Sequence, residues 1–227
     1  MWAICFRECK DLFKGFKPVL IISILLGMAM VSTRLGAAFP DEIEGVTQKE
    51  MYTSGLTLTI TLFGILFVFA LSHSVVNKEI ESKTIRFLVT KTSRNRILLG
   101  KFMGTVLFWL IIIGTCFTFI TLTSRMFHLT NYIEIMIFLL YSISAAFLLS
   151  NTVPKSSQSM FIGLILALAI PGLSLWAYFS ERWYIMWLKY VTPYYYTELA
   201  FPLQGVPLLF AALFIVLSLY LFKRRDF

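Results

Sequence analysis

Six long apolar stretches dominate the sequence and limit what the chain can fold into. They run from about Pro18 to Ala38, Met51 to Val76, Phe102 to Thr123, Tyr132 to Ser150, Met160 to Phe179 and Val206 to Phe222. A helix needs about 20 apolar residues to cross the hydrocarbon core of a bilayer. Because lipid offers no partner to unpaired backbone groups, the stretches are predicted to be helices. The sequence therefore predicts an all-α membrane protein with six transmembrane helices in a single transmembrane domain over residues 1–227.

Composition supports this fold class and excludes others. Charged residues make up 14% of the chain, against about 25% in soluble globular domains, and the mean hydropathy is +0.80. An ordinary soluble protein, a disordered chain and a nucleic-acid binder covered with basic residues are all excluded. Cys5, Cys9 and Cys116 include no CxxC pair and are too scattered for a disulfide framework.

The net charge of +8 is distributed unevenly between the two predicted sides of the membrane. One side holds fifteen basic residues: Arg7, Lys10, Lys14, Lys17, Lys78, Lys83, Arg86, Lys91, Arg94, Arg96, Lys101, Lys155, Lys223, Arg224 and Arg225. The other holds five: Arg34, Lys49, Arg125, Arg182 and Lys189. The positive-inside rule places both termini in the cytoplasm, which agrees with an even number of spans.

The segment 1–17 is predicted to form an amphipathic helix. Its apolar residues recur at spacings of three and four: Trp2, Cys5, Phe6, Cys9, Leu12, Phe13 and Phe16. The basic residues between them suit an interfacial helix on anionic lipid. The alternative is a short helix that packs on the bundle. Cys5 and Cys9 are interpreted as packing residues, because no His or third Cys lies nearby.

The segment 77–101 is the longest and most charged connection on the basic side. Its residues Ile80, Thr84, Phe87 and Leu88 share one helical face, which predicts a short amphipathic helix between the second and third spans. Such a helix suits docking to a cytoplasmic partner. The alternative is a solvated run of charges that only sets the topology.

Several residues of this connection follow a known pattern: Glu79, Glu81, Thr84, Leu88, Arg94, Gly100 and Lys101. With the six spans and the ending Phe222–Asp226, the chain resembles the type 2 ABC transporter permeases, the transmembrane subunits of bacterial ABC exporters. Two departures are Lys83, where that family usually has Gly, and Lys91, where it often has Pro.

The resemblance implies a permease of the bacterial cytoplasmic membrane that exports an amphipathic or hydrophobic peptide, such as a bacteriocin-like toxin, or a lipid-like molecule. The implied partners are two copies of a cytoplasmic ABC ATPase, which binds ATP and Mg²⁺, and a second permease chain, identical or paralogous. The implied ATPase-coupling residues are Glu79, Glu81, Thr84, Arg86, Leu88, Arg94 and Lys101. This chain itself is expected to bind no cofactor, metal or nucleic acid.

The segment 180–205 on the other side is too polar to span the membrane and unusually aromatic. Tyr and Trp favour the level of the lipid headgroups. We predict two short re-entrant helices interrupted near Pro193, an arrangement that the family also has at its outer mouth. The candidate gate residues are Trp183, Trp187, Tyr190, Pro193, Tyr194 and Tyr195. The alternative is an aromatic surface helix without a gating role.

The spans contain few polar features that point to chemistry. Glu134 is predicted to complete a capping box with Asn131, and Pro171 is predicted to bend the fifth span. Gly100-Lys101 is followed by Phe102, so it does not complete a phosphate-binding loop, and no catalytic motif is found. An intramembrane enzyme is therefore disfavoured, and the remaining alternative to a permease is a structural or sensory membrane protein.

Overall fold

The computed structural model describes residues 1–38, 48–85, 90, 92–180, 182–199 and 203–224. These residues form helices and turns and contain no strand. Six long helices are α2 (Phe16–Ala38), α3 (Gln48–Ser72), α6 (Arg94–Ser124), α7 (Leu129–Thr152), α8 (Ser156–Phe179) and α11 (Val206–Arg224). All six are long and apolar enough to cross a membrane, which confirms the six predicted helices.

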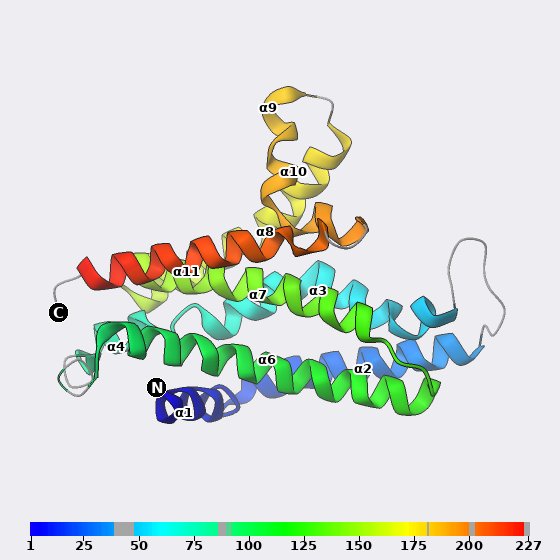
Figure 1. The fold of residues 1–227 in the computed structure, drawn as a ribbon, viewed down its shortest axis with the longest axis horizontal. Coiled ribbons are helices and arrows are strands. Elements are labelled where there is room, and N and C mark those ends of the chain that lie inside the picture. Colours follow the sequence, from blue (N-terminus) through cyan, green and yellow to red (C-terminus); the bar gives the residue numbers. More distant parts are fainter. Residues whose placement is uncertain (39–47, 86–89, 91, 181, 200–202, 225–227) are drawn as a thin grey trace.

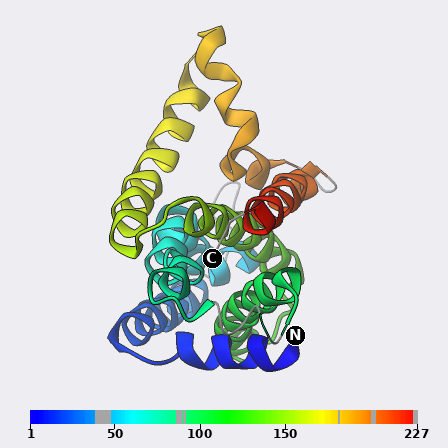
Figure 2. The ribbon, with the colours of Figure 1, turned by 90° about the vertical axis from the view of Figure 1, so that its left-hand side faces the viewer.

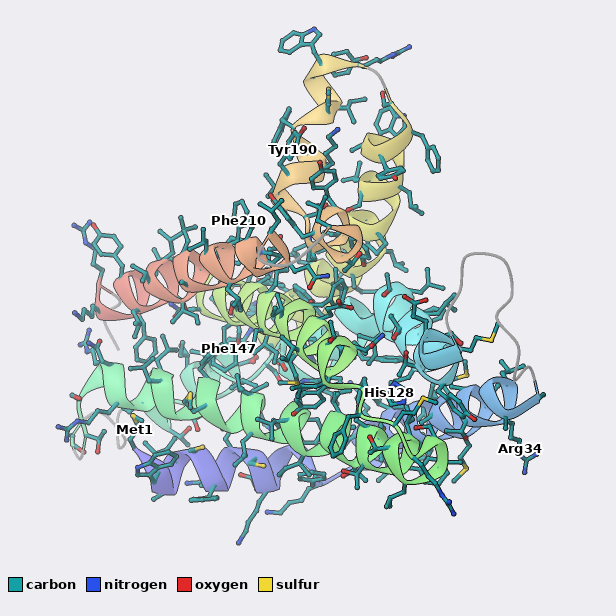
Figure 3. All side chains as sticks on the ribbon, turned by 45° about the vertical axis from the view of Figure 1, so that its right-hand side comes forward. Met1, Arg34, His128, Phe147, Tyr190 and Phe210 are labelled. Carbon is teal, nitrogen blue, oxygen red and sulfur yellow. The ribbon has the colours of Figure 1, made fainter. Side chains whose placement is uncertain are left out.

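Five of these helices, α2, α3, α6, α7 and α11, lie side by side in an elongated bundle (Figure 1). Its interior is strongly aromatic: Phe108, Trp109 and Phe147 are almost fully buried. Phe147 lies inside the bundle (Figure 3), where its ring meets Phe102 of α6 edge to face at 5.4 Å. By contrast, Phe161, Leu168 and other large apolar side chains are exposed on the outside, as expected of a bundle whose solvent is lipid.

One end of the bundle carries the start of α1 (Trp2–Leu12), the short helix α4 (Asn77–Glu81), the start of α6 and the end of α11 (Figure 1). We call it the basic end. The 31 residues of α6 correspond to about 46 Å of helix, more than a hydrocarbon core of about 30 Å. The side of the membrane that the basic end faces stays a prediction.

Helix α1 lies across the long helices and packs on the start of α6 (Figure 2). The contact is close because Gly100 and Gly104 have no side chain; a Cβ on Gly104 would lie 2.6 Å from the carbonyl oxygen of Cys5. Cys5 and Cys9 are buried there, which confirms that they are packing residues. The alternative prediction, a short helix that packs on the bundle, therefore holds for one face of α1. The side chains of Trp2 and Phe6 remain exposed. The helix ends at Leu12, earlier than predicted, and Gly15 (φ +116°) allows the turn into α2.

Helix α8 diverges from the bundle, and with α9 (Trp183–Met186) and α10 (Leu188–Val191) it forms an arm that projects from the other helices (Figures 1 and 2). The chain then returns through two 3₁₀ turns, η1 (Pro193–Glu198) and η2 (Leu203–Gly205), to α11. The backbone breaks at Thr192, directly before Pro193, where an interruption was predicted. Whether the arm re-enters a membrane stays a prediction. Pro171 lies within α8, which continues to Phe179.

Candidate functional site

The connection between α3 and α6 does not form the continuous helix that the sequence predicts. Helix α4 ends at Glu81, helical backbone resumes at Ile85, and Phe87 and Leu88 of the predicted face lie outside the described residues. The chain turns at Ser82–Thr84, and Lys83 has a left-handed backbone with φ of +60°. A helix cannot continue through such a residue, and hydrophobic spacing carries no sign of it. Arg86 and Leu88, two of the predicted coupling residues, lie outside the described residues.

A buried cation links this connection to the rest of the basic end. The Lys101 side chain of α6 is 4% exposed. Its Nζ lies 2.8 Å from Oε2 of Glu8 in α1 and 2.9 Å from Oε1 of Glu79 in α4. The same nitrogen donates a hydrogen bond of 3.0 Å to the carbonyl oxygen of Val75. These four residues, which we call the Lys101 clamp, hold α1, α4 and α6 together.

The Lys101 clamp contains two carboxylates and one ammonium group. Burial raises the pKa of Glu8, because desolvation of the carboxylate outweighs the attraction of Lys101. Repulsion by the nearby Glu79 raises the pKa further. When both glutamates are ionised, the cluster carries one uncompensated negative charge in a poorly solvated place. Protonation of Glu8 removes that excess charge.

The other charged side chains of the connection also bond to distant elements. Oε2 of Glu81 accepts a 3.1 Å hydrogen bond from the backbone N–H of Ser156, in the first turn of α8. That carboxylate serves as a cap, because the first N–H groups of a helix have no partner within it. Nη1 of Arg94, at the start of α6, donates a 2.7 Å hydrogen bond to the carbonyl oxygen of Lys223 near the end of α11. Arg94 thereby satisfies one of the free carbonyls at that helix end.

A second group of buried polar side chains fixes α4 to α7. Oγ of Ser150 accepts hydrogen bonds from the backbone N–H groups of Val76 (3.0 Å) and Asn77 (3.3 Å). Close by, Oγ of Ser159 in α8 donates a 2.7 Å hydrogen bond to the carbonyl oxygen of His73. The two serines satisfy backbone groups between α3 and α4 that have left the regular helix. Helix α4 is thus attached to α7 and α8 as well as to α1 and α6.

The structure therefore divides the predicted coupling residues into two groups. Four of them bond within the chain: Glu79 and Lys101 to each other, Glu81 to Ser156 and Arg94 to Lys223. Thr84 is exposed, and its hydroxyl lies 2.9 Å from that of Ser82. With Ser82 and Lys83 it forms an exposed turn that a partner can reach.

Sequence reasoning missed Glu8, the third charged member of the Lys101 clamp. Glu8 is one of the polar residues of segment 1–17, most of which are basic. A signal was present: Glu8 lies between Cys5 and Cys9 along the chain, close to the face that packs on Gly104. Its partner is 93 positions away, so no local pattern pairs the two.

The six candidate gate residues are also divided. Trp183, Trp187 and Tyr190 are exposed on the arm, where Figure 3 shows Tyr190 away from the bundle. Pro193 and Tyr194 lie where the chain returns, and the Tyr194 ring meets Phe138 of α7 edge to face at 5.3 Å. The sixth, Tyr195, stacks edge to face on Tyr190 at 5.1 Å and so joins the two groups.

The predicted capping box at the start of α7 is wrong. Helix α7 begins at Leu129, so Asn131 lies inside its first turn instead of preceding it. The Asn131 amide donates to the hydroxyl of Thr53 in α3 at 3.1 Å. Oε1 of Glu134 accepts a 2.9 Å hydrogen bond from the Gln204 amide in η2. Glu134 therefore has a structural role, but it anchors the returning chain and does not cap its own helix.

The chain was compared with protein-family models and with curated protein sequences. No protein-family model matches the chain, and no curated protein sequence matches it.

Proposed function

We propose that the chain is the permease subunit of an ATP-driven exporter of the type 2 ABC class, with its basic end in the cytoplasm of a bacterial cell. Two copies of a separate ATPase supply the energy and bind ATP and Mg²⁺. A second permease chain, identical or paralogous, completes the transporter. The proposal rests on the resemblance of residues 79–101 and on the way α4 is attached.

The attachment of α4 is the observation that carries the proposal. A connection that only set the topology would need a few basic residues in solvent. Here α4 is bonded through Glu79 to α6 and α1, through Glu81 to α8, and through its backbone to Ser150 of α7. A force applied to the exposed turn at Ser82–Thr84 therefore reaches four other helices: α1, α6, α7 and α8. This arrangement suits an element that transmits motion.

In the proposed mechanism, ATP closes the ATPase pair, and the ATPase presses on the Ser82–Thr84 turn. A ligand shifts a two-state equilibrium only by its difference in affinity for the two states, so ATP acts on the ATPase and the permease responds through this contact. The Lys101 clamp and the Glu81 contact convert displacement of α4 into movement of α1 and α8. The proposed cargo is an amphipathic or hydrophobic peptide, or a lipid-like molecule, in keeping with the apolar and aromatic helix surfaces.

Affinity purification of the chain from its native membrane, followed by mass spectrometry, tests the proposal. We expect a stoichiometric ABC ATPase in the wild-type sample and its loss from Thr84→Arg, which places a large cation on the docking turn. Thr197→Arg is the matched control, because Thr197 is an exposed threonine in η1, on the returning arm. Absence of an ATPase from gently solubilised wild-type protein contradicts the proposal and favours a structural or sensory membrane protein.

A further inference from the structure

A cavity of about 960 Å³ opens at the basic end between α1, the start of α2 and the end of α3. The Lys101 clamp lies against it, and the exposed α4 turn lines another part. Its lining includes five basic residues, Arg7, Lys14, Lys17, Lys78 and Lys101, and three acidic ones, Glu8, Asp11 and Glu79. A cavity of this size accommodates the polar part of a small amphipathic molecule.

The acidic residues of the cavity are already bonded to basic ones. Asp11 pairs with Lys14 at 2.6 Å and with Arg7 at 3.7 Å. The two glutamates share Lys101. Lys17 and Lys78 line the same cavity and make no ion pair within the part of the chain that the structure describes. The cavity therefore has two uncompensated ammonium groups, which favour an anion.

Hydroxyl groups accompany these cations. Ser74, Ser82 and Thr84 line the cavity. The hydroxyls of Ser82 and Thr84 bond to each other and to the carbonyl oxygen of Glu79, so each must exchange such a bond to donate to an oxyanion. Lysine ammonium groups with hydroxyl donors are a typical environment for a phosphate group. The chemistry of the lining thus matches a phosphate ester.

The position of the cavity indicates what the phosphate is attached to. Phe16 and Pro18 at the start of α2 form part of its wall, and the Phe16 side chain is 78% exposed. Val19 and Leu20 continue this exposed apolar surface along α2. Because α2 is a predicted membrane span, a molecule with its phosphate beside Lys17 and Lys78 would extend its apolar part along lipid-facing helix. Basic pockets between spans at the membrane surface bind anionic lipid headgroups.

We propose that this cavity binds the headgroup of an anionic glycerophospholipid, with Lys17 and Lys78 as the cations that hold its phosphate. The bound lipid bridges α1, α2 and α4 and so stabilises the arrangement of the basic end. This site does not depend on the proposed transport function, since it requires only that the apolar helices lie in a bilayer.

Native mass spectrometry of the full chain, delipidated in detergent, tests the site. The protein is titrated with dioleoyl phosphatidylglycerol, with dioleoyl phosphatidylcholine and with glycerol 3-phosphate. We expect phosphatidylglycerol to bind at least tenfold more tightly than phosphatidylcholine. In Lys17→Gln/Lys78→Gln that affinity should fall by about 25-fold, the product of about fivefold for each basic residue at an anionic surface. Arg96→Gln/Lys155→Gln removes the same charge from exposed positions outside the cavity and should bind like wild type.

Three results would overturn the proposal. Unchanged phosphatidylglycerol affinity in the cavity variant would show that the two lysines do not hold the headgroup. An equal loss in the control variant would indicate diffuse attraction to a basic surface. Equally tight binding of glycerol 3-phosphate would assign the cavity to a soluble phosphate ester. The melting temperature without lipid checks folding, and we expect all three proteins to agree within a few degrees because the substituted side chains are exposed.

Discussion

Replacing Lys101 with methionine removes the cation of the Lys101 clamp and keeps a side chain of similar length. It leaves the carboxylates of Glu8 and Glu79, whose side chains are 16% and 23% exposed, without their shared partner. Removing one partner of a buried ion pair costs about 3–5 kcal/mol. Glu8, whose pKa burial already raises, can limit this cost by taking up a proton. From an ordinary glutamate pKa of 4.5, protonation costs about 3.4 kcal/mol at pH 7 and about 0.7 kcal/mol at pH 5.

We therefore expect Lys101→Met to lower the free energy of unfolding by about 3 kcal/mol at pH 7 and by about 1 kcal/mol at pH 5. The assay is titration of the detergent-solubilised protein with SDS, followed by tryptophan fluorescence at both pH values. Lys155→Met, which removes an exposed cation from the same end, should change the free energy by no more than about 0.5 kcal/mol. A loss for Lys101→Met that is the same at both pH values, or no larger than for Lys155→Met, would refute the reasoning.

Glu8→Gln also tests the charge balance of the Lys101 clamp, because it removes a negative charge where Lys101→Met removes the positive one. Because burial raises the pKa of Glu8 in the folded state above its ordinary value of 4.5, its protonation stabilises the fold. That contribution is complete below pH 4.5 and is lost as the pH rises through the folded pKa. A glutamine keeps an acceptor for Lys101 without the charge, so we expect Glu8→Gln to be at least as stable as wild type at pH 7. The same SDS titration should show a weaker pH dependence for the variant. A destabilisation as large as that of Lys101→Met would contradict this account.

The remaining predictions concern backbone conformation and helix contacts. Lys83→Gly should raise the free energy of unfolding by about 1 kcal/mol, because glycine adopts a φ of +60° without strain; an unchanged SDS midpoint would argue against it. Ser150→Ala should lower it by about 2 kcal/mol by removing the acceptor of two buried N–H groups, whereas Ser142→Ala, which removes only a bond to its own helix, should cost much less. Gly104→Ala should displace α1 and increase maleimide labelling of its cysteines, while Gly114→Ala on the same helix, with open space around it, should not.

The spans could be predicted from the sequence because their signal is local. A run of about 20 apolar residues defines a membrane helix without reference to any other part of the chain. The fifth span was predicted over Met160–Phe179 and is observed over Ser156–Phe179, which shows how well such a run locates a helix. The helix ends are less exact because flanking polar residues continue the helix beyond the apolar run, as the early start of α6 at Arg94 shows.

The candidate site was predictable only in part, because its contacts are not local. Glu79 and Lys101 were recognised individually, but their pairing depends on the direction in which α4 and α6 leave the membrane. Glu8 and Ser150 join the same region from 93 and 74 positions away in sequence, and no periodicity connects residues at such separations. The early end of α4 was equally hidden, because a lysine gives no sign of a left-handed backbone.

The left-handed residue itself adds an argument about the docking turn. Type 2 ABC permeases usually have glycine at the position of Lys83, and glycine is the residue that adopts a positive φ at no steric cost. Lys83, which differs from the family pattern, thus has a backbone conformation that glycine favours. The lysine is held there by local hydrogen bonds: its N–H bonds to the carbonyl oxygen of Ile80 at 3.1 Å, and the hydroxyls of Ser82 and Thr84 meet across it at 2.9 Å. In the proposed mechanism, a turn fixed in this way, directly after a helix bonded to four others, would transmit the motion of the ATPase with little deformation of its own.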